Sequence, residues 1–454
     1  MDRIVDYLTS YTMGLQFDDL PQPVVHQAKR MMVDTLGCAV GGYDSQPSVI
    51  ARQMAANVSC SQPATVLGSG QRTTPDMAAF ANGVMIRYLD YNDGYSGKEA
   101  GHPSDAIAAI LSPAEIAHVD GREVIAATVL AYEVFCRLCD VVSAKAGGFD
   151  HVALGVIAAG LGAAKAMGLS REQTAETVNL CVSANMALYQ TRIGDVSMWK
   201  GCAFANASRN AIFAAQLAQR GLTGPSPIFE GPGGFFTAVS GGPFDLEPFA
   251  SGDGAYKIME ASIKRFPVGL YAQTVAEAAM EVRGMLSNAE DIVEVNVQTF
   301  KAAVDVMAGD EEKWHPTNRE TADHSMPYTV AVALMYGSVE HKHFGGEHLS
   351  NPRLMDLVKR VKIAVSEEAN RRAPEAMLCN VEVVTTSGER HRSADIPYYR
   401  GHWKNPMSEV ELEEKFRSLS SDHLTRGQME SILELLWNLE QVEDIGQVID
   451  LVRW

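Results

Sequence analysis

The sequence predicts a mainly helical protein: a large all-helical domain formed by both chain ends, with a smaller α+β lid domain between them. Three observations support this prediction. Helical periodicity dominates the first 260 or so residues, alternating strand patterns appear only between residues 292 and 396, and amphipathic helices return after Pro406. We therefore divide the chain into a helical domain of residues 1–259 and 402–454 and a lid of residues 260–401.

The helices of the first part are bounded by local signals. Pro21 precedes the first long helical stretch, Pro75 stands at a first helical position after Thr74, and Ser170 can form a capping box with Gln173. Many of the side chains are Ala, Gly or Ser, which allow helices to pack closely. The expected helices cover residues 24–42, 75–89, 122–142, 152–168, 171–188 and 201–221.

The lid combines strands with helices. Residues 292–300 alternate apolar and polar side chains, and residues 378–396 are typical of two strands joined at Ser387 and Gly388. Helical patterns cover 272–282, 327–337 and 351–361, and those that return to the first domain cover 408–419 and 428–440.

Charge and composition exclude several classes of function. The chain has 454 residues and a formal net charge of −18, which disfavours binding to nucleic acid or to an anionic membrane. The start of the sequence lacks the pattern of a secretory signal, and the apolar run at 152–164 is too short to span a bilayer. Seven scattered cysteines are typical of reduced thiols in the cytoplasm, where we expect the protein to be.

Two short motifs are interpreted as structural. Cys136 and Cys139 form a CxxC, but their spacing places them on the buried face of a helix. His341, His343 and His348 invite a metal site, but their spacing is not that of a helical metal motif and Lys342 lies among them.

Residues 88–105, YLDYNDGYSGKEAGHPSD, form an acidic loop between two helices. Alone, this stretch is typical of a solvated loop with capping acids, and we expect Asp93, Glu99 and Asp105 to be solvating or capping groups. Pro103 stiffens the segment after His102, however, and the flanking helices look buried. A pocket that contains Asp90 and His102 is the alternative.

Four further residues have both a structural and a functional interpretation. Lys200 and His151 each stand at the start of an apolar helix, where a lysine can snorkel and a histidine can be structural. Lys264 precedes the lid, and Tyr328 begins a lid helix. A pocket that unites them would hold cations, an imidazole and a phenol.

Taken together, the motifs resemble the MmgE/PrpD family, in the family's order and from about residue 33 to 416. The motifs are VDTLGCAVGG, NGVMIRYLDYND, GHPSD, MWKGCAFANASRN, KRFPVGLYAQTVAEAA, ETADHSMPYTVAVAL and YYRGHWKNPMSEVELEEKF. The resemblance implies a helical domain with an α+β lid, a homodimer, and lyase or epimerase chemistry on a small di- or tricarboxylate without a metal or organic cofactor. The wording LDYND and GHPSD resembles the 2-methylcitrate dehydratase branch.

The resemblance also implies a site between the two domains. Its catalytic residues would be Asp90, His102, His151, Lys200 and Tyr328, and its substrate-binding residues Lys264, Asn92, Gly94 and His324. Gly94 stands where members often carry Thr, and Gly269 where decarboxylase-type members carry a histidine.

Chemistry beside a carboxylate needs a base at carbon, cations for the substrate's charges and an acid for a departing hydroxyl. His102 or His151 is suited to be the base, and Lys200 and Lys264 are suited to be the cations. Tyr328 or a protonated histidine could be the acid. Asp90 would orient a histidine or act as a base itself. We therefore expect a hydro-lyase acting on a 2-methylcitrate-like tricarboxylate. A decarboxylase or epimerase of a related acid and a non-catalytic metabolite-binding dimer remain alternatives.

Overall fold

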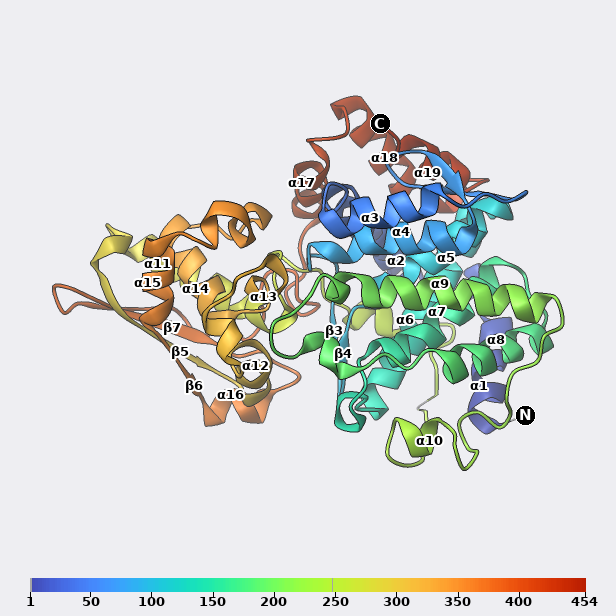
Figure 1. The fold of residues 1–454 in the computed structure, drawn as a ribbon, viewed down its shortest axis with the longest axis horizontal. Coiled ribbons are helices and arrows are strands. Elements are labelled where there is room, and N and C mark those ends of the chain that lie inside the picture. Colours follow the sequence, from blue (N-terminus) through green and yellow to red (C-terminus); the bar gives the residue numbers. More distant parts are fainter. Residues whose placement is uncertain (1, 247) are drawn as a thin grey trace.

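A computed structural model of the protein describes residues 2–246 and 248–454. It has a helical body, made from both chain ends, and a smaller lid that contains the main sheet (Figure 1). The body's buried apolar cluster reaches Ile263 and resumes at Met407, and the lid has its own cluster from Phe266 to Tyr399. These limits lie within a few residues of the predicted lid, 260–401.

The body holds most of the helices, including the longest ones. They are α1 (Arg3–Gly14), α2 (Gln22–Gly41), α3 (Gln46–Ala56), α4 (Pro75–Tyr88), α5 (Ile107–Ile116), α6 (Gly121–Val141), α7 (Val152–Ala166), α8 (Arg171–Ala184), α9 (Trp199–Gln219), α10 (Phe235–Ala238), α17 (Glu409–Ser420), α18 (Arg426–Trp437) and α19 (Gly446–Leu451). The predicted capping box of Ser170 and Gln173 is present at the start of α8. In Figure 1 the C-terminal helices lie against the N-terminal ones, and α17 packs on α2.

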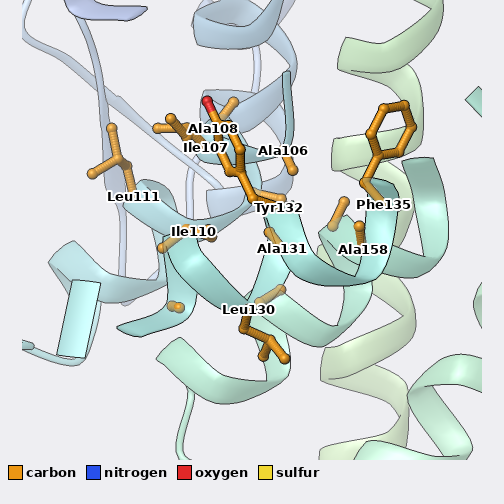
Figure 2. Close-up of a cluster of buried hydrophobic side chains, with 14 of the residues drawn as sticks. Ala106, Ile107, Ala108, Ile110, Leu111, Leu130, Ala131, Tyr132, Phe135 and Ala158 are labelled. Carbon is orange, nitrogen blue, oxygen red and sulfur yellow. The ribbon is translucent and has the colours of Figure 1, made fainter. Parts of the chain in front are cut away.

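Small residues set the distance between the central helices. A Cβ on Gly155 of α7 would lie 2.2 Å from the ring of Phe204 in α9, and one on Gly83 of α4 would lie 2.9 Å from Ala205. Since α7 follows His151 and α9 contains Lys200, this packing also fixes two candidate site residues. Figure 2 shows the buried apolar side chains that α5, α6 and α7 contribute nearby.

The lid sheet has the order β6-β5-β7-β8. Its strands are β5 (Ile292–Thr299), β6 (Val361–Val365), β7 (Asn380–Thr385) and β8 (Arg390–Arg392), of which β5 and β6 pair in parallel and the others antiparallel. The lid helices are α11 (Gln273–Met285), α12 (Lys301–Met307), α13 (Arg319–Ala322), α14 (Met326–Tyr336), α15 (Pro352–Lys359) and α16 (Glu367–Arg372). In Figure 1, α13 lies on the side of the lid that faces the body.

The strand at 292–299 and the hairpin are confirmed, with Gly388 in the left-handed region at φ 82°. Strand β6 was not predicted, although Val361, Ile363 and Val365 alternate directly after the helical pattern that ends at residue 361. Two small hairpins in the body were missed as well: β1 (Ala64–Val66) with β2 (Gln71–Thr73), and β3 (Tyr95–Ser96) with β4 (Ala100–Gly101). Among the described residues no helix combines the length and apolar character that a membrane span requires.

Candidate active site

Asp90 lies at the centre of a buried charged cluster. It follows the last turn of α4 in a left-handed conformation, at φ 51°, which aspartate tolerates better than most residues. Its side chain is 0% exposed. Such a strained and buried carboxylate is maintained only where partners hold it, and it is therefore a candidate for function.

Four side chains hold the Asp90 carboxylate. Arg87 Nη1 donates to Oδ1 at 2.8 Å, and Lys264 donates both to Oδ1 and, at 2.9 Å, to the Asp90 carbonyl. Lys200 Nζ and His324 Nδ1 lie 3.3 and 3.0 Å from Oδ2. Arg87, Asp90 and Lys200 come from the body, Lys264 from the junction and His324 from the lid, so the cluster joins the two domains.

These charges shift one another's pKa. Burial alone would raise the pKa of Asp90, but Arg87, Lys264 and Lys200 outweigh it and hold that pKa well below its usual value. Burial lowers the pKa of Lys264 to about 8, although Asp90 works against this shift. The cluster therefore contains a lysine that can exchange its proton near neutral pH.

The Lys200 ammonium lies between Asp90 of the body and two lid residues, Asp323 and His324. It donates to Asp323 and to Asp90, and it is 3.1 Å from His324 Nδ1. The same three partners are close enough to hold a metal ion, because their ligand atoms lie within 4.8 Å of one another. In this structure the ammonium of Lys200 bonds to both carboxylates and lies against His324 Nδ1, which faces the same two carboxylates.

The net charge of the cluster is small. Arg87, Lys200 and Lys264 face the carboxylates of Asp90 and Asp323, and Arg87 also pairs with Asp105, whose pKa burial raises to about 7. The cluster therefore has a charge of about +1 when His324 is neutral and Asp105 keeps its proton. Burial, together with the Lys200 charge, lowers the pKa of His324 to about 4, so its ring is neutral at pH 7. One excess positive charge in a buried place still favours an anionic ligand.

The hydrogen bonds of His102 define its tautomer. Nδ1 lies 2.7 Å from the carbonyl oxygen of Asp93, which only accepts, so Nδ1 carries the proton. Nε2 lies 2.9 Å from Arg87 Nη2, which only donates. Burial, followed by the charge of Arg87, lowers the pKa of His102 well below its usual value. His102 is thus a neutral ring with both nitrogens engaged.

His151 has a different arrangement. Its Nδ1 lies 2.7 Å from Asp150 Oδ1, and the two rings of His102 and His151 are 5.6 Å apart. Its Nε2 is buried, and within the described part of the chain no group hydrogen-bonds to it. A neutral ring whose Nδ1 donates to a carboxylate leaves Nε2 as a bare acceptor, which is what a general base requires.

Of the expectation that Asp93 and Asp105 are solvating or capping groups, the solvated part is wrong, whereas Asp93 does accept from the Ser104 amide at the start of a turn. Asp93 and Asp105 are 0% and 2% exposed, because the β3–β4 hairpin and the turn at Pro103 fold the loop back onto α6. Tyr132 donates to Asp93 at 2.7 Å, and Asn92 donates to Asp105 at 2.7 Å. Burial raises the pKa of Asp93 to about 6 and that of Asp105 to about 7. Glu99 is half-buried and accepts from the Lys145 amide.

Asn92, Gly94 and Tyr328 lie around the cluster rather than in it. Asn92 supports the loop through Asp105, and Gly94 pairs with Ser262 through two backbone hydrogen bonds of 2.8 and 2.9 Å. The Tyr328 hydroxyl donates to the His343 carbonyl at 2.7 Å, inside the lid's apolar cluster. The structure therefore brings together Asp90, His102, His151, Lys200, Lys264 and His324.

Several residues in and around this charged cluster were not identified from the sequence. Arg87 stands one helical turn before Asp90, and Asp323 directly precedes His324, so both were within the quoted motifs. Lys415 of α17 donates to the carbonyls of Tyr91 and Lys264 at 2.8 and 2.9 Å. That lysine is more than 150 residues from either partner, and its helix looked like an ordinary amphipathic one.

A cavity of about 740 Å³ lies at the junction beside this cluster. Tyr88 and Leu89 border it just before Asp90, Met198 just before Lys200, and Glu320 just before Asp323. Its other lining residues come from the α2–α3 turn, from α17 and from the lid loop near His341. The cavity is thus lined by sequence neighbours of the cluster and not by the side chains of Asp90, Lys200 or His324 themselves.

Comparison with known families covers both domains. A model described as the MmgE/PrpD N-terminal domain matches residues 6–247, and one described as the MmgE/PrpD C-terminal domain matches residues 266–441. The second match includes α17 and α18, which pack with the helical body.

Curated relatives match along nearly the whole chain. A cis-aconitate decarboxylase of Homo sapiens is 28% identical and covers 100% of this chain and 95% of its own length. A mitochondrial 2-methylcitrate dehydratase of Yarrowia lipolytica is also 28% identical, over 99% of this chain and 90% of its own. A 2-methylcitrate dehydratase of Escherichia coli is 26% identical, over 99% and 96%.

Proposed function

Because the chain belongs to the MmgE/PrpD family, we propose that it is a lyase that eliminates water from a tricarboxylate similar to 2-methylcitrate. The observation that carries this proposal is the unengaged Nε2 of His151, next to a cluster with one excess positive charge. A base beside cations is the combination that proton removal next to a carboxylate requires.

In the proposed reaction, His151 Nε2 takes a proton from the carbon next to a substrate carboxylate. Lys200 and Arg87 stabilise the negative charge that develops, and the electrons of the broken C–H bond form the new double bond. The departing hydroxyl takes a proton from the Lys264 ammonium, whose pKa of about 8 suits a donor near neutral pH, and leaves as water. Lys264 replaces Tyr328 in this role because the Tyr328 hydroxyl already donates to a lid carbonyl.

Decarboxylation of a related acid is the second candidate, because one of the relatives is named as a cis-aconitate decarboxylase. The surroundings of Gly269 favour dehydration instead. A side chain at this position would begin 2.9 Å from the sulfur of Met307, so Met307 fills the space that a histidine at this position would need. Epimerisation and ligand binding without turnover are the remaining alternatives.

The test is incubation of the purified protein with 2-methylcitrate, citrate and cis-aconitate. We expect an increase in ultraviolet absorbance from the alkene with 2-methylcitrate. In proton NMR the methyl doublet should become an allylic singlet if the methine proton is removed, and a vinylic signal should appear if a methylene proton is removed. Carbon dioxide release from cis-aconitate indicates the decarboxylase, and thermal stabilisation by these acids without any product indicates the binding protein. Exchange of a substrate proton with deuterated water, without an alkene, indicates the epimerase.

We also propose that the protein is a homodimer. Trp199 and Phe213 lie on one face of α9 and are 48% and 53% exposed, and Leu188, in the segment before it, is 62% exposed. Large apolar side chains that gather on a surface are typical of an interface. Light scattering during size-exclusion chromatography, with Phe213→Glu as the test variant, measures whether the mass halves. A monomeric mass for the unmodified protein contradicts the proposal.

A further inference from the structure

Arg192 connects the candidate base to the rest of the site. It ends a short 3-10 helix (Tyr189–Arg192) in the segment between α8 and α9. Its Nε donates to Asp150 Oδ2 at 2.7 Å, and its Nη1 donates to the Lys200 carbonyl at 3.3 Å. The side chain is 9% exposed, so one buried guanidinium links the start of α7 to the start of α9.

Asp150 is shared between Arg192 and His151. Oδ2 accepts from Arg192, while Oδ1 accepts from the Val152 amide at 3.2 Å and lies 2.7 Å from His151 Nδ1. Burial alone would raise the pKa of Asp150, but Arg192 and His151 hold it well below its usual value. The carboxylate is therefore ionised and has a fixed direction, which fixes the tautomer of His151 in turn.

Whether Arg192 favours or disfavours a second proton on His151 follows from the charges around the ring. An ionised Asp150 alone would favour the imidazolium, and the positive charge of Arg192 offsets this attraction. Other titratable groups near these residues include His102, which is neutral, and Arg87 behind it, which also disfavours an imidazolium. The buried Asp105, whose charge interacts with Arg87 and Arg192, acts in the opposite direction when it is ionised. A ring whose Nδ1 carries the proton and faces Asp150 keeps its Nε2 available as an acceptor.

We propose that Arg192 is a positioning residue for the base: through Asp150 it holds His151 in the Nδ1–H tautomer, and its charge offsets the pull of Asp150 on a second ring proton. This inference rests on the proposed function, in which His151 Nε2 accepts the substrate proton. Arg192 itself touches neither the substrate nor Nε2. Its loss acts through the proton affinity of His151.

The test compares Arg192→Gln, Arg192→Lys and the control Arg209→Gln. Arg209 is a half-buried arginine of α9 whose guanidinium bonds to Asn210. NMR of protein labelled with ¹³C at histidine Cε1 follows the titration of every ring, and the His151 signal is assigned from its loss in His151→Gln. This measurement needs no substrate.

We expect the titration midpoint of His151 to rise by about one pH unit in Arg192→Gln, a tenfold change in proton affinity. It should stay within a few tenths of a unit in Arg192→Lys, which keeps the charge, and in Arg209→Gln. The acid limb of kcat/KM against pH should move upward by the same amount in Arg192→Gln, with KM for the substrate little changed.

An unchanged His151 midpoint in folded Arg192→Gln overturns the inference. A shifted midpoint in a protein without turnover of any tested acid refutes the proposed function instead, and leaves the charge coupling measured. If Arg192→Gln does not fold, Asp150→Asn serves as the second variant. It should lower the midpoint, and a rise there contradicts the reasoning.

Discussion

The buried pair of Lys415 and Asp34 offers a test of how the C-terminal helices stabilise the site. Lys415 Nζ lies 2.6 Å from Asp34 Oδ1, and it donates to the carbonyls of Tyr91 and Lys264. The two side chains are 5% and 1% exposed. Lys415→Met keeps most of the apolar stem but removes the ammonium.

The expected loss of stability in Lys415→Met arises because the Asp34 carboxylate stays buried without its partner. Removal of one partner from a buried ion pair typically costs about 3–5 kcal/mol. With an unfolding entropy scaled to a helical body of roughly 300 residues, this corresponds to a decrease in Tm of about 5–8 °C. Burial already raises the pKa of Asp34 with Lys415 present. In the variant Asp34 binds a proton more readily, and the loss should be smaller at pH 5 than at pH 8.

Differential scanning calorimetry at the two pH values measures this effect. The exposed pair of Lys301 and Asp305 provides the control, because Lys301→Met should change the Tm by less than about 1 °C. The double variant Asp34→Asn with Lys415→Met should recover part of the loss, because it leaves no buried charge. A decrease below 2 °C in Lys415→Met, or a double variant less stable than the single one, would refute the reasoning.

Three other predictions concern the site and its packing. His151→Gln should lower kcat for the proposed dehydration by about 10²–10⁴ with an unchanged Tm, because a general base is lost. Asp105→Asn should gain stability relative to the unmodified protein as pH rises from 4 to 7. The buried Asp105 carboxyl, with its pKa raised to about 7, keeps a proton that the unfolded chain releases near pH 4, so the unmodified protein loses stability over this range. Gly155→Ala should cost about 1–3 kcal/mol, because its Cβ would lie 2.2 Å from the Phe204 ring.

For each of these three predictions, one result would contradict it. A His151→Gln protein with more than a tenth of the original kcat excludes that residue as the base. A Tm difference for Asp105→Asn that stays constant between pH 4 and 7 excludes the raised pKa. A Gly155→Ala protein as stable as the original, by thermal unfolding, indicates that α7 and α9 can separate freely.

The sequence was informative where structure is local. Ser170 and Gln173 lie three residues apart, and Ser387–Gly388 lies between two alternating runs, so both signals are contained in a short window. Burial of Asp93 and Asp105 was not predictable in this way, because it depends on how a Gly-rich loop folds back onto a distant helix. The same limit applies to Arg192, whose partner Asp150 is 42 residues away. For Asp90 and Lys264 the residues alone left a structural and a functional interpretation open, and the family resemblance favoured the functional one.

The ionic contacts of the cluster also have a kinetic consequence. Lys200 of the body bonds to Asp323 of the lid, so separation of the two domains must break a buried ion pair. We expect a small acid that binds beside Lys200 to be enclosed by this contact. The exit of the product should then be the slow step of turnover, and its rate should change little with ionic strength because salt screens a buried ion pair only weakly.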